Sequence, residues 1–262
     1  MPARGRRQRY GAPWTRDELI LAFDLYCRIP FKKTKANNPE VIELAGLLKR
    51  SPASVARKLG NFGSFDPELH KRQVVGLTHA SKLDRAVWDE FHGGWNELVV
   101  QARRLREQHR LQGQTDEALE EDLIFPQGVS EKDVLRKTRI HQSFFREAVL
   151  ASYEDTCCVT GLRIRECLIA SHIVPWSVAE QHRTDPRNGL CLSATFDRLF
   201  ERGLLTITPD LVVSVSPRLR ESPDQTTSKM VCVFHDRPIV RPRRFLPLDD
   251  HLAWHREKVF QD

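Results

Sequence analysis

The sequence predicts an α+β protein with two folded domains, the first helical and the second containing both strands and helices. The chain has 262 residues, of which 40% are hydrophobic, so it is long enough to bury two separate cores. Residues 1–111 carry 21 Lys and Arg against 12 Asp and Glu, whereas residues 112–135 carry one against seven. We therefore predict a domain over 1–111, an acidic linker over 112–135 and a second domain over 136–262.

Helix start signals recur through the first domain. Thr15 and Glu18 fit a capping box at the start of a helix over about 15–28. A capping residue followed by a first-turn proline occurs twice more, at Asn38-Pro39 and at Ser51-Pro52, and each pair precedes a short apolar repeat. Apolar and aromatic residues continue at helical spacing over 66–111, so the whole domain is expected to be helical.

The second and third of these helices are short and closely joined, which is typical of a helix-turn-helix. In that geometry the second helix of the pair enters the major groove of DNA. Its face turned away from the apolar positions would make the contacts, through Ser54, Arg57, Lys58 and Asn61. Short helical pairs also occur in domains that bind nothing, and a basic face is often simply solvated, so both interpretations stay open.

The second domain is expected to begin with a helix over about 132–152. A strand over 158–161 that enters a tight turn, and a returning strand over 166–173, then predict a β-hairpin that presents His172 at its end. A short apolar segment over 189–192 leads to a helix over about 194–202 that Ser193 caps and Gly203 ends. Further strands are expected near 204–216 and 230–235.

The helix over 194–202 carries three stripes when its residues are placed at 100° intervals. One is apolar, one acidic and one basic, and their members are Phe196, Leu199 and Phe200, then Asp197 and Glu201, then Arg198 and Arg202. One face can therefore anchor the helix while the others remain available for a cation and for phosphate.

The pattern richest in chemistry is Ser171-His172-Ile173-Val174-Pro175, followed by Asn188-Gly189-Leu190 and then by Asp197. Phosphodiester hydrolysis needs a base that takes a proton from water and a divalent cation that neutralises charge on the phosphate. An imidazole and a carboxylate on adjacent elements can supply both. Taken singly, a histidine at a strand end or an acidic residue on a charged helix is more often structural. The joint spacing, with Pro175 and Gly203 in register, favours a nuclease site.

These residues resemble the HNH family of nucleases, over about residues 139–207. The family has a ββα-metal fold, in which a hairpin and a helix hold one divalent cation, and the similar branch carries His-Ile-x-Pro, Asn-Gly-Leu and Phe-Asp-x-Gly patterns. The resemblance implies that His172 is the general base, that Asn188 holds the loop and orients this base, and that Asp197 is a metal ligand. It also implies Mg²⁺, or Mn²⁺ or a similar ion, as cofactor, and DNA as substrate. Restriction of foreign or modified DNA is a hypothesis suggested by the same resemblance.

The chain departs from the family pattern at two places. Many members have an acidic residue before the base as a second metal ligand, where this chain has Ser171, so Glu201 or water would complete the coordination. Related nucleases often brace the hairpin with a Cys₄ zinc site, but the places that would match Cys157 are held here by Thr160, Ser193 and Phe196. We therefore expect no structural zinc, and packing by Phe196, Phe200 and Trp176 in its stead. Ser171 also motivates an alternative, a non-catalytic DNA-binding regulator with a decayed nuclease domain.

The remaining expectations concern partners and compartment. The net charge of +6 and the basic N-terminal half favour a nucleic-acid partner, with Arg139 and Arg146 either gripping phosphate or forming a solvated face. No segment approaches the ~18 apolar residues of a membrane span, and no apolar signal region follows the N-terminal arginines, so a soluble, cytoplasmic protein is expected. The six scattered cysteines argue against a disulfide framework. One ββα-metal centre cuts one strand per engagement, so double-strand cleavage would require a dimer, most simply a twofold homodimer.

Overall fold

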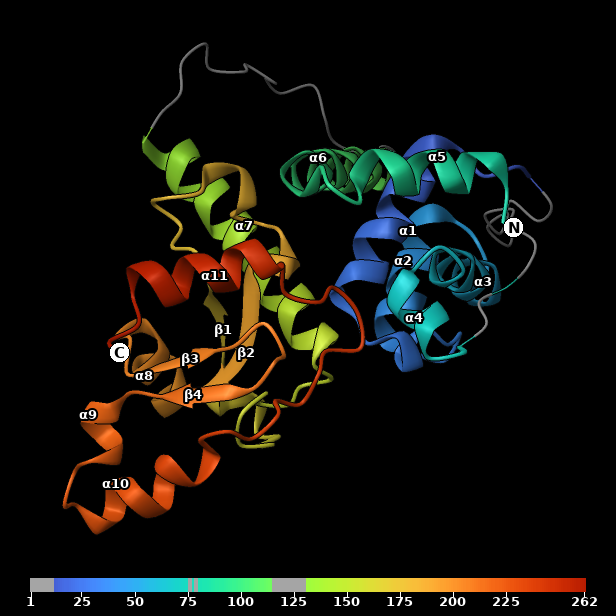
Figure 1. Cartoon of the computed structure of the whole chain (residues 1–262). Helices are drawn as coiled ribbons and strands as arrows, with labels where there is room; N and C mark the ends of the chain where they lie inside the picture. Colours follow the sequence, from blue (N-terminus) through green and yellow to red (C-terminus); the bar gives the residue numbers. More distant parts are fainter. Residues whose placement is uncertain (1–11, 75–76, 78–79, 115–130) are drawn as a thin grey trace. The chain divides into compact units, whose positions relative to one another are not determined.

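The structure, a computed structural model, describes residues 12–74, 77, 80–114 and 131–262, with the side chains of 112–114 and 131–138 left aside. The chain divides into two compact units, Met1–His141 and Gln142–Asp262 (Figure 1). Most of the predicted acidic linker, over 115–130, lies outside the described residues. No helix in the described ranges is long and apolar enough to cross a membrane.

The N-terminal unit is helical, as the sequence predicts. Thr15 and Glu18 form the expected capping box, Asn38 accepts a hydrogen bond from the backbone of Glu40, and Ser51 accepts one from Ser54. The helices are α1 (Arg16–Arg28), a 3₁₀ turn η1 (Phe31–Lys33), α2 (Pro39–Leu48), α3 (Pro52–Gly63), α4 (Pro67–Lys71), α5 (Lys82–Phe91) and α6 (Trp95–Gln114).

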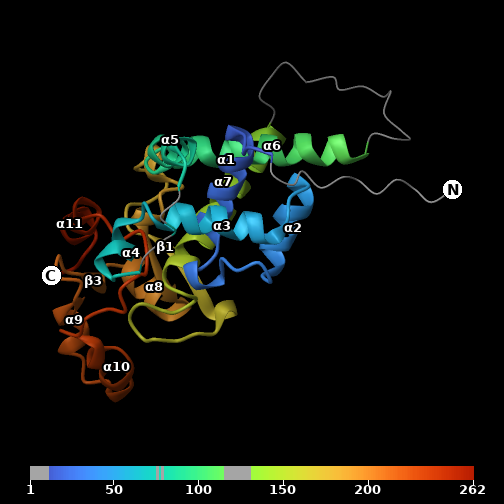
Figure 2. The ribbon, with the colours of Figure 1, turned by 90° about the vertical axis from the view of Figure 1, so that its right-hand side faces the viewer.

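Helix α1 is the centre of this unit. It contacts α2, α3, α5 and α6, and its residues from Glu18 to Cys27 are all buried (Figure 2). The rings of Phe23 and Tyr26 lie 5.0 to 6.1 Å from those of Phe62 and Trp88, in tilted or edge-on arrangements. An aromatic core of this kind contributes both buried apolar area and favourable ring geometry. Phe23, Tyr26, Phe62 and Trp88 are therefore core residues.

Four side chains of α3 were predicted to face outward and contact DNA, and for two of them this orientation is wrong. The side chain of Asn61 is buried and donates to Asp84 Oδ2 at 2.9 Å. Lys58 Nζ lies 2.8 and 2.9 Å from the two carboxylate oxygens of Asp84. Asp84 caps the first turn of α5 and is fully buried, and a buried carboxylate requires such partners. Of the predicted set, Arg57 is exposed and Ser54 half-buried.

The C-terminal unit contains two small antiparallel hairpins surrounded by helices. The strands are β1 (Leu168–His172) paired with β2 (Gly189–Ser193), and β3 (Leu205–Ile207) paired with β4 (Val213–Val215). The helices are α7 (Glu131–Ser152), which belongs to this unit from Gln142 onward, α8 (Ala194–Glu201), α9 (Pro217–Arg220), α10 (Gln225–Met230) and α11 (Asp249–Lys258), with 3₁₀ turns η2 (Arg165–Cys167), η3 (Glu180–His182), η4 (Pro186–Asn188) and η5 (Cys232–Phe234). The chain is thus α+β, with a mostly helical N-terminal region.

The hairpin of the site differs from the predicted one. Residues 158–161 form a turn at Gly161, which has φ +74°, instead of a strand, and β1 pairs with the segment 189–193 that follows the long loop. The apolar run 189–192 is completely buried, as a central strand segment would be. It therefore pairs with β1 in place of residues 158–161. The expected strand near 230–235 is also wrong, because these residues form the end of α10 and the turn η5.

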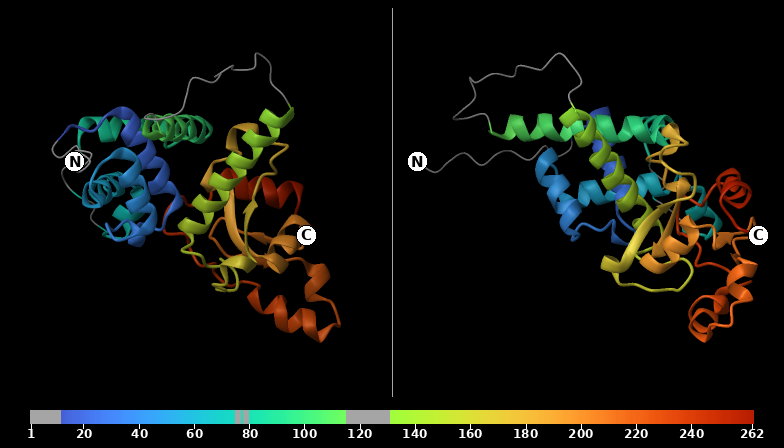
Figure 3. Two further views of the ribbon diagram at one scale, coloured as in Figure 1. Left: turned by 180° about the vertical axis from the view of Figure 1, so that it is seen from behind. Right: turned by 90° about the vertical axis from the view of Figure 1, so that its left-hand side faces the viewer.

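Helix α8 contacts both strands of the β1–β2 hairpin, and α7 contacts the hairpin at Leu168 and Gly189 (Figure 3). Gly189 faces α7, where an added Cβ would overlap Val149 and press on Phe145, so only glycine permits this approach. Phe196 and Phe200 of α8 are buried in the core of the unit, as predicted, whereas Trp176 is only half-buried and stays outside that core. The prediction that Trp176 packs in the core in place of a zinc site is therefore wrong.

Gly203 ends α8 at a crowded place. Its φ of +67° is a left-handed conformation that suits glycine, and an added Cβ would overlap the backbone carbonyl of Val259. The last residues of the chain are fixed against this corner, since Gln261 N donates to Gly203 O at 2.9 Å and Gln261 Nε2 donates to Arg202 O at 2.8 Å. The C-terminal segment after α11 therefore packs onto the end of α8.

Candidate active site

A cavity of about 500 Å³ lies in the C-terminal unit, where the end of β1 meets α8. It brings together most of the residues that the sequence singles out in this domain. They are Ser171 and His172 of β1 with Asp197, Arg198 and Glu201 of α8 and the adjacent Arg202. Ser171 and His172 are consecutive and lie on opposite faces of β1, but His172 is the last residue of the strand, so both can line a cavity at this end.

The ring of His172 is clamped between two aromatic residues. It stacks on Phe145 of α7, with ring centroids 3.7 Å apart and the planes 10° from parallel, and it meets Trp176 edge-on at 5.7 Å. Its Nε2 lies 3.1 Å from the carbonyl oxygen of Arg183. Because a carbonyl oxygen only accepts, Nε2 carries the proton and Nδ1 has the free lone pair. Nδ1 is therefore the atom that can take a proton from water.

Burial sets the charge state of this histidine. Removal from water lowers the pKa of His172 below its ordinary value of 6.5, and the hydrogen bond to Arg183 O offsets only part of this effect. The imidazole is consequently neutral at pH 7, which is the state that a general base requires.

Asn188 fixes the loop that leaves β1. Its side chain is fully buried, accepts a hydrogen bond from Val174 N at 2.9 Å and donates one to Val174 O at 3.0 Å. Its backbone carbonyl accepts from Ile173 N at 2.9 Å. Two segments fourteen residues apart are thus tied together directly after His172. This arrangement holds the end of β1 in one conformation.

Asp197 lies on the α8 side of the cavity and is nearly buried. Burial raises the pKa of its carboxyl group, the negative charge of Glu201 adds to this effect, and a hydrogen bond with the Ser171 side chain counteracts it. Glu201 is exposed and forms an ion pair with Arg198, with Nη1 3.1 Å from Oε2. The guanidinium of Arg198 and that of Arg202 are exposed beside these carboxylates, where they can meet a phosphate group.

The oxygen donors fit a hard divalent cation that keeps part of its water shell. Mg²⁺ is usually bound through one or two carboxylates, with water and substrate phosphate completing its octahedron. Asp197 and Glu201 could supply the carboxylates, and a cation between them would offset the repulsion that raises the Asp197 pKa. Within the described residues no group of three or more His, Cys, Asp or Glu is placed to hold a metal ion.

Cys157, Cys158 and Cys191 are small buried groups near the hairpin, whereas Cys167 is exposed. Cys157 Sγ accepts backbone N–H groups from Ser193 at 3.2 Å and from Thr160 at 3.5 Å. Burial raises the pKa of Cys158 well above its ordinary value and that of Cys191 to about 12, so both thiols stay protonated at neutral pH.

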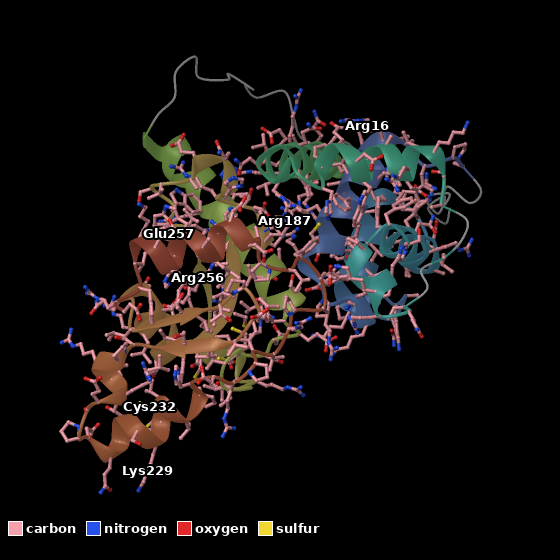
Figure 4. All side chains as sticks on the ribbon, viewed as in Figure 1. Arg16, Arg187, Lys229, Cys232, Arg256 and Glu257 are labelled. Carbon is pink, nitrogen blue, oxygen red and sulfur yellow. The ribbon has the colours of Figure 1, made fainter. Side chains whose placement is uncertain are left out.

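Two predicted phosphate-binding residues lie elsewhere. Arg146 is half-buried and donates to the carbonyl oxygen of Leu168 at 2.8 Å, so it braces β1 against α7. Arg139 is exposed on α7, and neither arginine lines the cavity. The guanidinium of Arg187, labelled in Figure 4, is bound within the protein, because it donates two hydrogen bonds to the Asp185 carboxylate, at 2.7 and 2.9 Å.

Three contributors to the site were not identified as such from the sequence. Nothing in the spacing of Phe145 along the chain indicates that it stacks on His172. Arg183 acts through its backbone carbonyl, which no sequence pattern can reveal. His255 forms part of the cavity wall, although both of its ring nitrogens are used inside the protein, by Thr206 Oγ1 and by Phe200 O.

The comparison with known families agrees with the resemblance found in the sequence. Residues 157–208 match the model of a family described as HNH endonuclease, and this span contains His172, Asn188 and Asp197. No curated protein matches the chain. Taken with the hairpin, loop and helix that form the cavity, this match shows that the chain carries an HNH endonuclease domain at residues 157–208.

Proposed function

We propose that the protein is a metal-dependent endonuclease that hydrolyses DNA phosphodiester bonds in its HNH domain. The observation that carries the proposal is the shared cavity, in which a neutral imidazole and a carboxylate pair are presented from adjacent elements. A cation held by Asp197, with Glu201 and water, would neutralise charge on the phosphate and on the leaving oxygen. His172 Nδ1 takes a proton from the attacking water, and Asn188 keeps the strand end in place.

The basic side chains at the mouth of the cavity suit a polyanionic substrate. Arg198 and Arg202 are exposed on the rim and can contact phosphates beside the scissile bond. We assign DNA binding also to the N-terminal unit, where Arg57 remains on the surface of α3. We further propose a role in restriction of foreign or modified DNA, which rests on the family resemblance. Plating efficiency of phage on cells that express the protein or its His172→Ala variant tests that role.

The direct test is cleavage of supercoiled plasmid with Mg²⁺ or Mn²⁺, with EDTA as the metal-free reaction. His172→Ala and Asp197→Asn should each lower the rate by at least about 100-fold, which is the typical contribution of a general base or of a lost electrostatic stabiliser. Asp236→Asn is the matched control, because that carboxylate is 81% exposed and lies outside the cavity. Cleavage that persists in His172→Ala would refute the assignment of the base.

A non-catalytic DNA-binding regulator is the second candidate. It is favoured by Ser171, whose side chain stands where many family members have a carboxylate ligand and is hydrogen-bonded to Asp197. Binding of DNA without cleavage under any divalent ion would support this candidate. Offering single-stranded RNA, duplex RNA and DNA in parallel identifies the substrate class.

A further inference from the structure

The loop between β1 and β2 folds back so that Arg183 meets the catalytic histidine. The carbonyl oxygen of Arg183 is the hydrogen-bond acceptor for His172 Nε2, at 3.1 Å. The side chain of the same residue turns to the start of the loop. Its Nε donates to Trp176 O at 3.1 Å, and its Cζ lies 5.2 Å from the centroid of the Trp176 ring. Arg183 thereby ties the later part of the loop to its start.

These contacts form a closed ring of interactions around the imidazole. Trp176 holds the guanidinium of Arg183, the backbone of Arg183 holds His172, and the ring of His172 meets Trp176 edge-on. An arginine on an aromatic ring is held by cation–π attraction and by stacking, and both strengthen when water is excluded. The side chain of Arg183 is 27% exposed, so much of this contact is removed from water.

The backbone hydrogen bonds of the turn around residue 183 are long. They measure 3.4 Å from Arg183 N to Glu180 O and 3.3 Å from Asp185 N to His182 O. Asn188 Nδ2 reaches His182 O at 3.4 Å, but its two short bonds go to Val174. The guanidinium of Arg183 bonds to Trp176 O and also pairs with Glu180 Oε1 at 2.7 Å, so it is one restraint on where the carbonyl of residue 183 lies.

We propose that Arg183 is a positioning residue: its guanidinium, held by Trp176, keeps its own carbonyl oxygen opposite His172 Nε2, so that the ring proton stays on Nε2 and Nδ1 faces the reacting water. The inference rests on the proposed function in one respect, that His172 is the base. The preference for one tautomer is a property of the protein without metal or substrate, and it can be measured separately. Loss of the hydrogen bond would let the proton move to Nδ1, and a fraction of the molecules would then lack a base.

The first experiment is NMR of protein labelled with ¹³C and ¹⁵N at histidine, without metal, at a pH where the His172 ring is neutral. The wild type should show the Nε2–H tautomer, and Arg183→Ala should show a mixture with Nδ1–H. Arg163→Ala is the matched control, because it removes the same charge from an exposed position in the same domain. Trp176→Leu tests the other end of the restraint and should shift the tautomer in the same direction. An unchanged tautomer in both Arg183→Ala and Trp176→Leu overturns the proposal.

The second experiment separates positioning from substrate binding. Arg183→Ala should lower kcat by about 10- to 100-fold, a part of the usual general-base contribution, and leave KM within about twofold. A raised KM with unchanged kcat, and a flatter dependence of DNA affinity on salt, would mean that Arg183 is a phosphate contact and would overturn the proposal. Should the variant not fold, Arg183→Lys keeps the charge but loses the planar stacking group. A lowered kcat with KM little changed is expected for this variant too, and a raised KM with unchanged kcat would again overturn the proposal.

The two experiments also distinguish the failure of this inference from failure of the proposed function. If the wild type cleaves no nucleic acid, the nuclease proposal falls, while a tautomer shift in Arg183→Ala still establishes the restraint. If cleavage depends on His172 but Arg183→Ala changes neither the His172 tautomer nor kcat, only the proposed role of Arg183 is refuted.

Discussion

His255 is kept neutral in the interior of the C-terminal unit, so acid should destabilise this unit. The ring of His255 is 2% exposed and stacks on Phe200 at 3.6 Å. Its Nε2 lies 3.0 Å from Phe200 O and its Nδ1 2.9 Å from Thr206 Oγ1. Since the carbonyl can only accept, Nε2 carries the proton and the Thr206 hydroxyl donates to Nδ1. A second proton has no acceptor in this arrangement.

The magnitude follows from the shift in proton affinity. Burial lowers the pKa of His255 from 6.5 to about 4, while the hydrogen bond to Phe200 opposes the change. The unfolded chain therefore binds a proton more readily than the folded one between these two values, and stability falls as the pH drops from about 6.5 to about 4. At ~1.36 kcal/mol for each tenfold change in affinity, the full loss is about 3 kcal/mol.

The assay is urea unfolding at pH 7.5 and pH 4.5, followed through backbone amide resonances of β3 and α11 so that the C-terminal unit is observed alone. His255→Gln keeps a donor for Phe200 O but does not titrate. It should be less stable than the wild type at pH 7.5, because the stacked ring is lost. Its loss of stability between the two pH values should be smaller than that of the wild type by about 2–3 kcal/mol. Equal losses in the two proteins would refute the reasoning.

Three further predictions concern packing and buried charge. Asp84→Ala should lower the unfolding free energy of the N-terminal unit by about 3 kcal/mol in denaturant titrations, because it leaves Lys58 and Asn61 without their buried partner. Although burial opposes it, hydrogen bonds from Lys58, the Ser81 backbone and Asn61 lower the pKa of Asp84, so its contribution should be present above its ordinary pKa near 3.8 and vanish as the pH falls through the lower folded value. Glu18→Gln should cost a similar ~3 kcal/mol, measured the same way, since Glu18 accepts from Arg50 at 2.7 and 2.9 Å with both side chains 3% exposed. Gly189→Ala should destabilise the C-terminal unit by about 1–3 kcal/mol in calorimetry, because its methyl group would overlap Val149, and an unchanged transition would contradict the close approach of α7.

Local signals in the sequence were sufficient for the helical parts of the fold. The caps at Thr15, Asn38 and Ser51 are where they were predicted, because a helix start depends on residues within one turn of it. The spacing of His172, Asn188 and Asp197 likewise identified the domain, since those residues occupy set places in one supersecondary unit. The strands were less predictable. Residues 158–161 and 189–192 are both short and apolar, and only competition for a partner decided which of them pairs with β1.

Contacts between side chains and partners on distant elements could not be predicted from the sequence. Lys58 and Asn61 have the composition of a DNA-reading face, yet they turn inward because Asp84, more than twenty residues later, is a buried carboxylate that needs them. The partner of His172 is a backbone oxygen of Arg183, and a carbonyl group is the same in every residue. Neither contact leaves a trace in residue type or spacing.

By itself, the sequence determined which residues could do chemistry and which segments would be helices, because both depend on groups close together along the chain. The tertiary structure alone decided that Ser171, His172, Asp197 and Glu201 line one cavity, and that Nδ1 is the free nitrogen of the imidazole. The physical reason is that burial and long-range hydrogen bonding set proton positions and pKa values, and both exist only once α7, the hairpin and α8 have packed together.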